Sequence, residues 1–222
     1  MTIIVGRKMA LLLEEEEFER IIPFVTWILI GLNIVVFVLE LYHPWIIRAF
    51  CFVPADFFMG RHLETLITYM FIHEDILHLL VNMYFLWVFC DDLENVYGHG
   101  YFIFFYLASG VGGAIVYAVL NTGDPFSGTI GASGAIFGAM AAYAIFFPRR
   151  KLLIVSVYTL EIDAWKYAVI YAIIEFLFAM LGIFKNVAHT AHLGGFLTGT
   201  VIGYVYKVIA KPRIYRTPQK PW

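Results

Sequence analysis

The chain has 222 residues, of which 61% are apolar and only 14% are charged. A soluble domain of this length carries roughly 25% charged residues, so the composition excludes an ordinary soluble enzyme and a disordered chain. The formal net charge of −2 provides no general attraction to phosphate backbones, and we expect no nucleic-acid partner. Two cysteines, Cys51 and Cys90, are too few for a disulfide framework. The composition therefore predicts a protein that crosses a membrane several times.

Residues 1–20 come before the first apolar stretch and include an acidic run, Glu14 to Glu17. They lack the basic start, apolar centre and small-residue cleavage site of a signal peptide. We interpret them as a short cytosolic segment.

Six charge-poor stretches follow, and a transmembrane helix needs about 20 mostly apolar residues. They are Ile21–Leu39, Ile76–Cys90, one stretch within Asn95–Gly123, Pro125–Pro148, Tyr167–Phe184 and Asn186–Tyr206. Continuous apolarity favours helices over the alternating strands of a membrane barrel. We therefore predict an all-α, polytopic membrane domain of six helices over residues 21–207, followed by a basic cytosolic tail at 208–222.

The distribution of Lys and Arg predicts the orientation of the helices. With the N-terminus in the cytosol, twelve of the 15 basic residues lie on the inner side. We expect a cell-membrane protein with both termini cytoplasmic, and a tail that can also contact anionic lipid. The segment His43–Asp75 is rich in aromatic residues, which predicts a structured external loop lying partly in the membrane interface.

Four polar residues stand near the starts of the second, fourth and sixth stretches: His78, Asn82, Ser133 and His192. These three stretches run in the same direction, so the four side chains are expected at similar depth, near the outer surface. Each alone is compatible with a packing role. Together they predict a nucleophile, a base and donors for an oxyanion.

Small residues recur at four-residue spacing in the fourth and sixth stretches, at Gly134 and Gly138 and at Gly195, Gly199 and Gly203. Such stripes allow two helix backbones to approach closely. We therefore expect these two helices to contact each other and to bring His192 to Ser133.

No metal and no cofactor are predicted. His73 and His78 are five residues apart, which does not place them on one helical face as in H-E-x-x-H. His189 and His192 are three apart, but we expect no carboxylate or cysteine near them to complete a site. Glu175, within the fifth stretch, has no evident partner, and protonation, pairing within the bundle or a part in substrate gating all stay open.

With these residues in hand, the chain resembles the rhomboid intramembrane serine proteases of the six-span prokaryotic type, from about Arg20 to Lys207. Four motifs carry the resemblance: His78-x-x-x-Asn82, Leu93-Glu94 followed by Gly98, Gly131-x-Ser133-Gly134, and His192-x-x-Gly195-x-x-x-Gly199. Two features differ from many members. No Trp-Arg pair precedes Thr68, and Phe137 stands where tyrosine is frequent.

The resemblance implies that Ser133 is the nucleophile and His192 its general base, a dyad without an orienting aspartate. It implies that His78, Asn82 and the backbone N–H of Ser133 stabilise the oxyanion. It gives supporting positions to Phe137, Gly131, Gly134, Gly195, Gly199 and Glu94. The implied substrates are single-span or polytopic membrane proteins, cut near the outer face, with the fifth helix as lateral gate.

Two other functions stay open. A catalytically silent rhomboid-like protein that binds membrane helices would not need both Ser133 and His192. A carrier of small solutes would be expected to have polar residues at mid-membrane, where only Glu175 lies. The oligomeric state cannot be deduced from the sequence.

Overall fold

A computed structural model describes residues 20–121, 124, 126–155, 159–184, 187–210 and 212. The acidic N-terminal run and most of the basic tail lie outside the described residues, as do Lys185 and Asn186 at the expected start of the sixth stretch.

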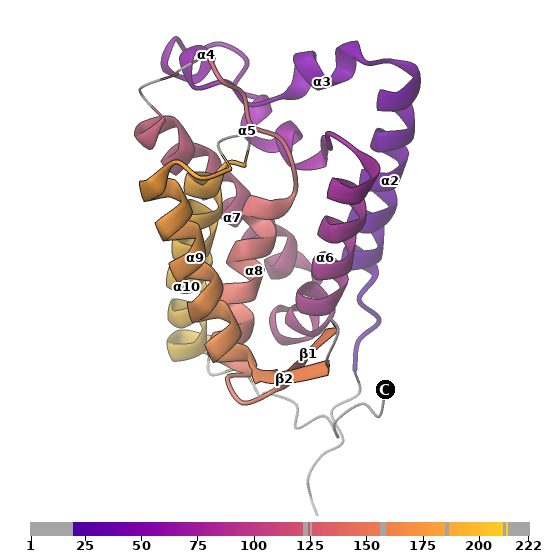
Figure 1. Cartoon of the computed structure of the whole chain (residues 1–222). Helices are drawn as coiled ribbons and strands as arrows, with labels where there is room; N and C mark the ends of the chain where they lie inside the picture. Colours follow the sequence, from indigo (N-terminus) through magenta and orange to yellow (C-terminus); the bar gives the residue numbers. More distant parts are fainter. Residues whose placement is uncertain are drawn as a thin grey trace, which may run out of the picture.

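The described part of the chain forms a bundle of six main helices (Figure 1). These are α2 (Phe24–Tyr42), α6 (Ile76–Tyr97), α7 (His99–Leu120), α8 (Ser133–Phe146), α9 (Ala164–Leu181) and α10 (His189–Ala210). All except α8 are long and apolar enough to cross a membrane. The predicted polytopic, helical membrane fold is confirmed, with helix ends displaced by a few residues from the predicted stretches.

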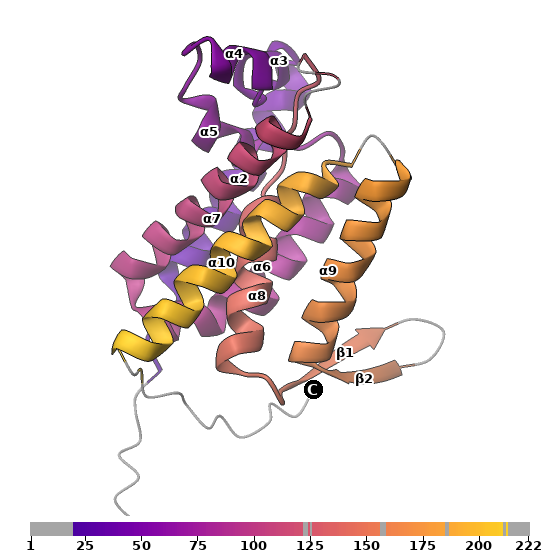
Figure 2. The same ribbon diagram turned by 90° about the vertical axis from the view of Figure 1, so that its left-hand side faces the viewer.

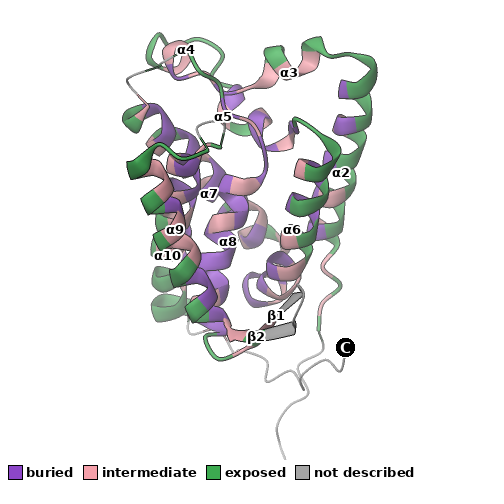
Figure 3. Cartoon of the chain, in the orientation of Figure 1, coloured by how far each residue is buried: buried purple, intermediate pink, exposed green. Residues whose placement is uncertain are grey.

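The shortest of the six main helices, α8, occupies the centre of the bundle. Most residues of the 14-residue α8 are buried, whereas α2, α9 and α10 present large apolar side chains on their outer faces (Figure 3). Long α10 packs along both α8 and α7 (Figure 2). An apolar exterior around a packed centre is the arrangement expected of a protein whose surroundings are lipid.

Residues 126–132, directly before α8, are not helical, contrary to the expectation of a span starting near Pro125. Thr129 pairs with Phe52 in an antiparallel bridge, and the Gly131 N–H donates to the Tyr69 carbonyl at 2.9 Å. These bonds satisfy the backbone of a loop that enters the bundle, so α8 starts lower than the top of α2 (Figure 1).

The segment between α2 and α6 is folded, as predicted. It contains α3 (Trp45–Phe50), α4 (Pro54–Phe58), α5 (Thr65–Thr68) and the 3₁₀ turn η1 (Tyr69–Phe71). These short helices cover one end of the bundle, which we call the site end (Figures 1 and 2). Phe52, Tyr69 and Met70 are buried beneath them, so the cover is anchored to the core.

The opposite end carries a feature that we did not predict, an antiparallel hairpin of β1 (Lys151–Val155) and β2 (Thr159–Asp163). Lys151 pairs with Asp163 in register, and their side chains form an ion pair at 2.5 Å. Ion pairing with Lys151 lowers the pKa of the Asp163 carboxyl. The hairpin connects α8 to α9.

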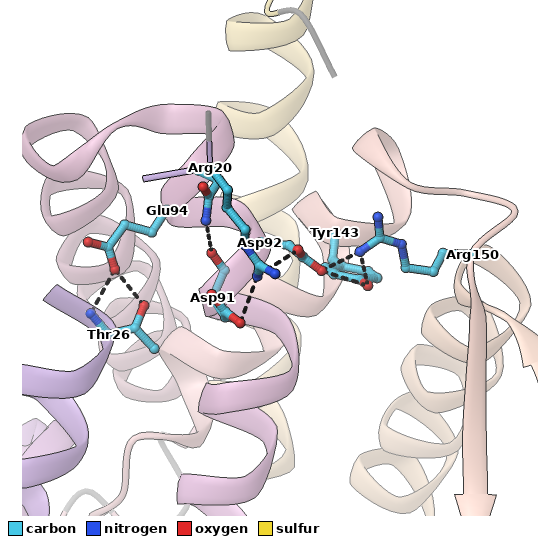
Figure 4. A network of polar contacts seen from close by, with 8 residues as sticks. Arg20, Thr26, Asp91, Asp92, Glu94, Tyr143 and Arg150 are labelled. Carbon is cyan, nitrogen blue, oxygen red and sulfur yellow. Dashed lines mark hydrogen bonds and ion pairs between the residues drawn. The ribbon is translucent and has the colours of Figure 1, made fainter. Parts of the chain in front are cut away.

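Glu94 lies at this opposite end, about four and a half turns along α6 from His78. Its buried carboxylate accepts a hydrogen bond from the backbone N–H of Val25 at 2.9 Å. It accepts another from the backbone N–H of Thr26 at 2.8 Å (Figure 4). It thereby satisfies free N–H groups at the start of α2, where Pro23 offers no side-chain cap. Glu94 supports the fold and is not part of the site around Ser133.

A second carboxylate at the same end joins three parts of the chain. Asp92 of α6 contacts Arg20 at 3.2 Å, Tyr143 of α8 at 3.3 Å, and Arg150 just after α8 (Figure 4). Arg20 also pairs with Asp91 at 2.8 Å. This network fixes the start of the described chain and the end of α8 to α6.

Candidate functional site

The site is organised around the first residues of two helices. Ser133 is the first residue of α8, and His192 lies in the first turn of α10. Nε2 of His192 is 2.8 Å from Oγ of Ser133, a hydrogen-bond distance. The two side chains are 59 residues apart in the sequence, so the contact depends on the packing of α8 against α10.

The glycines allow that packing, as predicted. A Cβ atom added to Gly195 would lie 1.9 Å from the carbonyl oxygen of Gly134, and one added to Gly199 would lie 2.2 Å from that of Gly138. Both distances are far below van der Waals contact, so only glycine fits at either position. The close approach of the backbones brings the first turn of α10 within reach of Ser133.

Phe137 lies one turn after Ser133 and stacks on the ring of His192. The ring centroids are 4.4 Å apart and the planes differ by 6°. The His192 ring is stacked on one face and hydrogen-bonded at Nε2, so it has little freedom to rotate.

Gly131 allows a histidine to approach the nucleophile. Its φ of +112° lies in the region that favours glycine, and a Cβ here would lie 2.8 Å from Nε2 of His78. The His78 ring therefore lies beside the loop that leads to Ser133. The first N–H groups of α8, including that of Ser133, have no partner within their own helix, so the start of α8 can bind negative charge.

Asn82 is buried one turn after His78, and its Nδ2 donates to the His78 carbonyl at 2.9 Å. The α6 helix starts with Asp75, whose carboxylate accepts from the backbone N–H of His78 at 2.8 Å. The structure thus places His78 close to Gly131. It gives Asn82 a bond within its own helix, which uses one of the two amide protons.

His73, which precedes α6, packs against the His78 ring. Their ring centroids are 5.1 Å apart in an edge-on arrangement, and His73 is fully buried. Burial, with a smaller contribution from the nearby His78, lowers the pKa of His73 to about 4. His73 is therefore neutral at ordinary pH.

Glu175 of α9, for which the sequence left pairing within the bundle open, has two histidine partners. Its Oε2 lies 2.9 Å from Nδ1 of His192 and 2.7 Å from Nδ1 of His189, and all three side chains are buried. The expectation that no carboxylate lies near His189 and His192 is therefore wrong. A signal was available, because Glu175 and His189 each lie seven residues from Gly182, where α9 ends and the chain reverses.

The same three residues could hold a metal ion, since their ligand atoms lie within 4.8 Å of one another. Tetrahedral zinc with bonds of about 2.1 Å separates its ligand atoms by about 3.4 Å. Both nitrogens are closer than that to a single carboxylate oxygen, at 2.7 and 2.9 Å. The geometry fits hydrogen bonds better than coordination.

Comparison with known proteins identifies the architecture. The family model of the rhomboid domain matches residues 60–208, which include every residue of the site. The chain belongs to the rhomboid family.

Three relatives illustrate the similarity. Presenilin-associated rhomboid-like protein A, mitochondrial, from Danio rerio is 33% identical over 64% of this chain and 38% of its own length. Rhomboid protein 1, mitochondrial, from Saccharomyces cerevisiae is 27% identical over 88% of this chain and 60% of its own length. RHOMBOID-like protein 6, mitochondrial, from Arabidopsis thaliana is 31% identical over 73% of this chain and 47% of its own length. The chain spans about 40 to 60% of the length of these rhomboid relatives.

The expected location in the cell membrane, with cytoplasmic termini, is wrong. The relatives just described are all named as mitochondrial proteins. The bias of Lys and Arg distinguishes one side of a membrane from the other, but it does not identify the membrane. The multi-pass fold itself agrees with the prediction.

Proposed function

We propose that this rhomboid is an intramembrane serine endopeptidase, with Ser133 as nucleophile and His192 as general base. The observation that carries the proposal is the 2.8 Å contact between Nε2 of His192 and Oγ of Ser133, inside a bundle of apolar helices. In soluble hydrolases this pairing removes the serine proton during attack.

The proposed reaction has two steps. Neutral His192 accepts the Ser133 proton while Oγ attacks a peptide carbonyl carbon, and the proton then passes to the leaving amine. Water, activated by the same histidine, hydrolyses the resulting acyl-enzyme. Both residues lie close to the site end, which is covered by the short helices α3, α4 and α5.

The oxyanion is stabilised in this proposal by donors already in place. The backbone N–H of Ser133 is free of helical bonds, and the His78 ring lies over Gly131 beside it. Asn82, one turn along α6, has a second amide proton to donate. Fixed donors aimed at developing charge are usually the largest single contribution to such catalysis.

The substrates are proposed to be membrane proteins, cut within or beside a transmembrane segment. A helix in lipid satisfies its own backbone bonds, so cleavage requires local unwinding and favours segments with helix-breaking residues. Because the relatives are named as mitochondrial, we propose a mitochondrial membrane as the location.

A purified-protein assay tests the proposal. The protein in detergent is incubated with labelled single-span substrates, beside the variant Ser133→Ala. We expect cleavage by the wild type and none by the variant. Cleavage by both proteins would refute Ser133 as nucleophile, and cleavage by neither would favour a silent protein that only binds membrane helices.

A further inference from the structure

We propose that Glu175 is a positioning residue that completes a Ser133–His192–Glu175 arrangement, in which the carboxylate orients the base. The inference rests on the proposed function, because it assigns a role within the same site. It replaces the dyad implied by resemblance with three groups from three helices, α8, α10 and α9.

The first argument is the direction of the bonds. His192 uses both ring nitrogens: Nε2 contacts Ser133 at 2.8 Å, and Nδ1 contacts Oε2 of Glu175 at 2.9 Å. To accept the serine proton, Nε2 must present its lone pair, so the proton of neutral His192 must lie on Nδ1. A carboxylate oxygen accepts that N–H and thereby selects the required tautomer.

The second argument is that Glu175 is itself held in place. His189 contacts the same Oε2 through Nδ1 at 2.7 Å, and its Nε2 lies 2.9 Å from the carbonyl of Ile183. A carbonyl only accepts, so Nε2 of His189 carries a proton. The bond to Oε2 then needs a further proton between His189 and Glu175.

This proton count makes His189 and Glu175 together electrically neutral, wherever the shared proton lies between Nδ1 and Oε2. Neutrality explains how a buried carboxylate is tolerated in a membrane helix. Whether the shared proton lies on Nδ1 of His189 or on Oε2 of Glu175, Oε2 can still accept a hydrogen bond from the Nδ1–H of His192. His189 therefore anchors the carboxylate, and the carboxylate orients the base.

The third argument concerns the fold. The buried face of α9 comprises Ala164, Tyr167, Ala168 and Glu175, and its opposite face is apolar and exposed. Glu175 thus points into the bundle toward α10. The contact makes α9, the helix expected to gate substrate entry, part of the site.

The test is the substitution Glu175→Gln, which keeps the shape of the side chain. The Gln amide can donate to Nδ1 and so favours the wrong tautomer of His192. We expect kcat to fall by about 10⁴-fold, as it does when the acid of a soluble triad is replaced. KM should change little, and Glu175→Asp, which keeps the carboxylate, should retain more activity than Glu175→Gln.

The matched control is Glu40→Gln. Glu40 is also a buried carboxylate in a long helix, α2, and its Oε2 accepts a hydrogen bond from the backbone N–H of His73 at 3.3 Å. We expect this variant to keep wild-type kcat. If Glu175→Gln also keeps wild-type kcat while Ser133→Ala is inactive, the proposed protease stands and the role of Glu175 is refuted.

A second measurement does not depend on any Glu175 variant folding. In ¹⁵N-histidine NMR of the wild type, with His192→Asn to assign the signal, we expect the neutral ring of His192 to carry its proton on Nδ1. A proton on Nε2 would overturn the inference. So would loss of activity on treatment with EDTA that zinc restores, because the cluster would then be a metal site.

Discussion

The imidazole of His192 lies face to face with the phenyl ring of Phe137, at a centroid separation of 4.4 Å and an angle of 6°. The stack restricts tilting of the imidazole, while the bonds to Ser133 and Glu175 restrict rotation in its plane. The orientation of the proposed base is therefore set by three contacts, two from α8 and one from α9.

Removal of the stack should weaken catalysis moderately. Aromatic pairs contribute roughly 0.5–1.5 kcal/mol beyond their buried area, which corresponds to a two- to tenfold effect on a rate. We expect Phe137→Ala to lower kcat by about that factor, and Phe137→Tyr to stay close to wild type. Steady-state cleavage kinetics measure both. An unchanged kcat in Phe137→Ala would show that the stack has no part in positioning His192.

Separation of α8 from α10 should abolish activity without altering any proposed catalytic atom. A side chain at Gly199 has no room, since its Cβ would lie 2.2 Å from the carbonyl oxygen of Gly138. We expect Gly199→Val to lose cleavage and to lower the melting temperature. Gly31→Val is the matched control, because a Cβ at Gly31 in α2 meets nothing within 4 Å. Full activity in Gly199→Val would contradict the dependence of the site on close backbone packing.

Asn82 and Asn95 form a natural pair for testing the oxyanion. Each donates its side-chain amide to the carbonyl four residues earlier in α6, at 2.9 and 2.8 Å, but only Asn82 is near the site end. We expect Asn82→Ala to lower kcat by about 10²- to 10³-fold, as for loss of an oxyanion donor. Asn95→Ala should leave kcat unchanged. Equal kinetics in the two variants would remove Asn82 from the proposed mechanism.

The buried His73 should make the fold sensitive to acid. In the unfolded chain it titrates near pH 6.5, whereas in the folded protein its pKa is about 4. Between these values the unfolded chain binds a proton that the folded protein does not, so stability falls as the pH is lowered through this window. The loss can reach about 3 kcal/mol.

Thermal unfolding at pH 7 and pH 4.5 measures this effect. We expect the drop in melting temperature on acidification to be smaller in His73→Phe than in the wild type, since phenylalanine binds no proton. Equal drops in the two proteins would contradict a depressed pKa at His73.

Much of the fold could be predicted because its causes are local. Long apolar stretches define the membrane helices, and the four-residue spacing of Gly134 with Gly138 and Gly195 with Gly199 indicates which two helices touch. That contact in turn brings His192 to Ser133. The hairpin between α8 and α9 was missed because its strands are only five residues each and lie beside the basic end of an apolar stretch.

The role of Glu175 depends on an antiparallel contact that a single stretch does not reveal. The distance from Glu175 to His189 depends on where α9 ends and on how tightly the chain reverses at Gly182, which adopts a left-handed conformation. The contacts of Glu94 could not be predicted for a similar reason. Its partners, Val25 and Thr26, are almost 70 residues away in the sequence.

Reaction with a fluorophosphonate probe tests the central claim most directly, because it reports the nucleophile without requiring the natural substrate. The purified protein is treated with the probe and digested, and the modified peptide is mapped by mass spectrometry. We predict a covalent adduct on Ser133 in the wild type, strongly reduced in His192→Asn and absent in Ser133→Ala. An adduct on another residue, or wild-type labelling of Ser133 after loss of His192, would contradict a serine activated by this histidine.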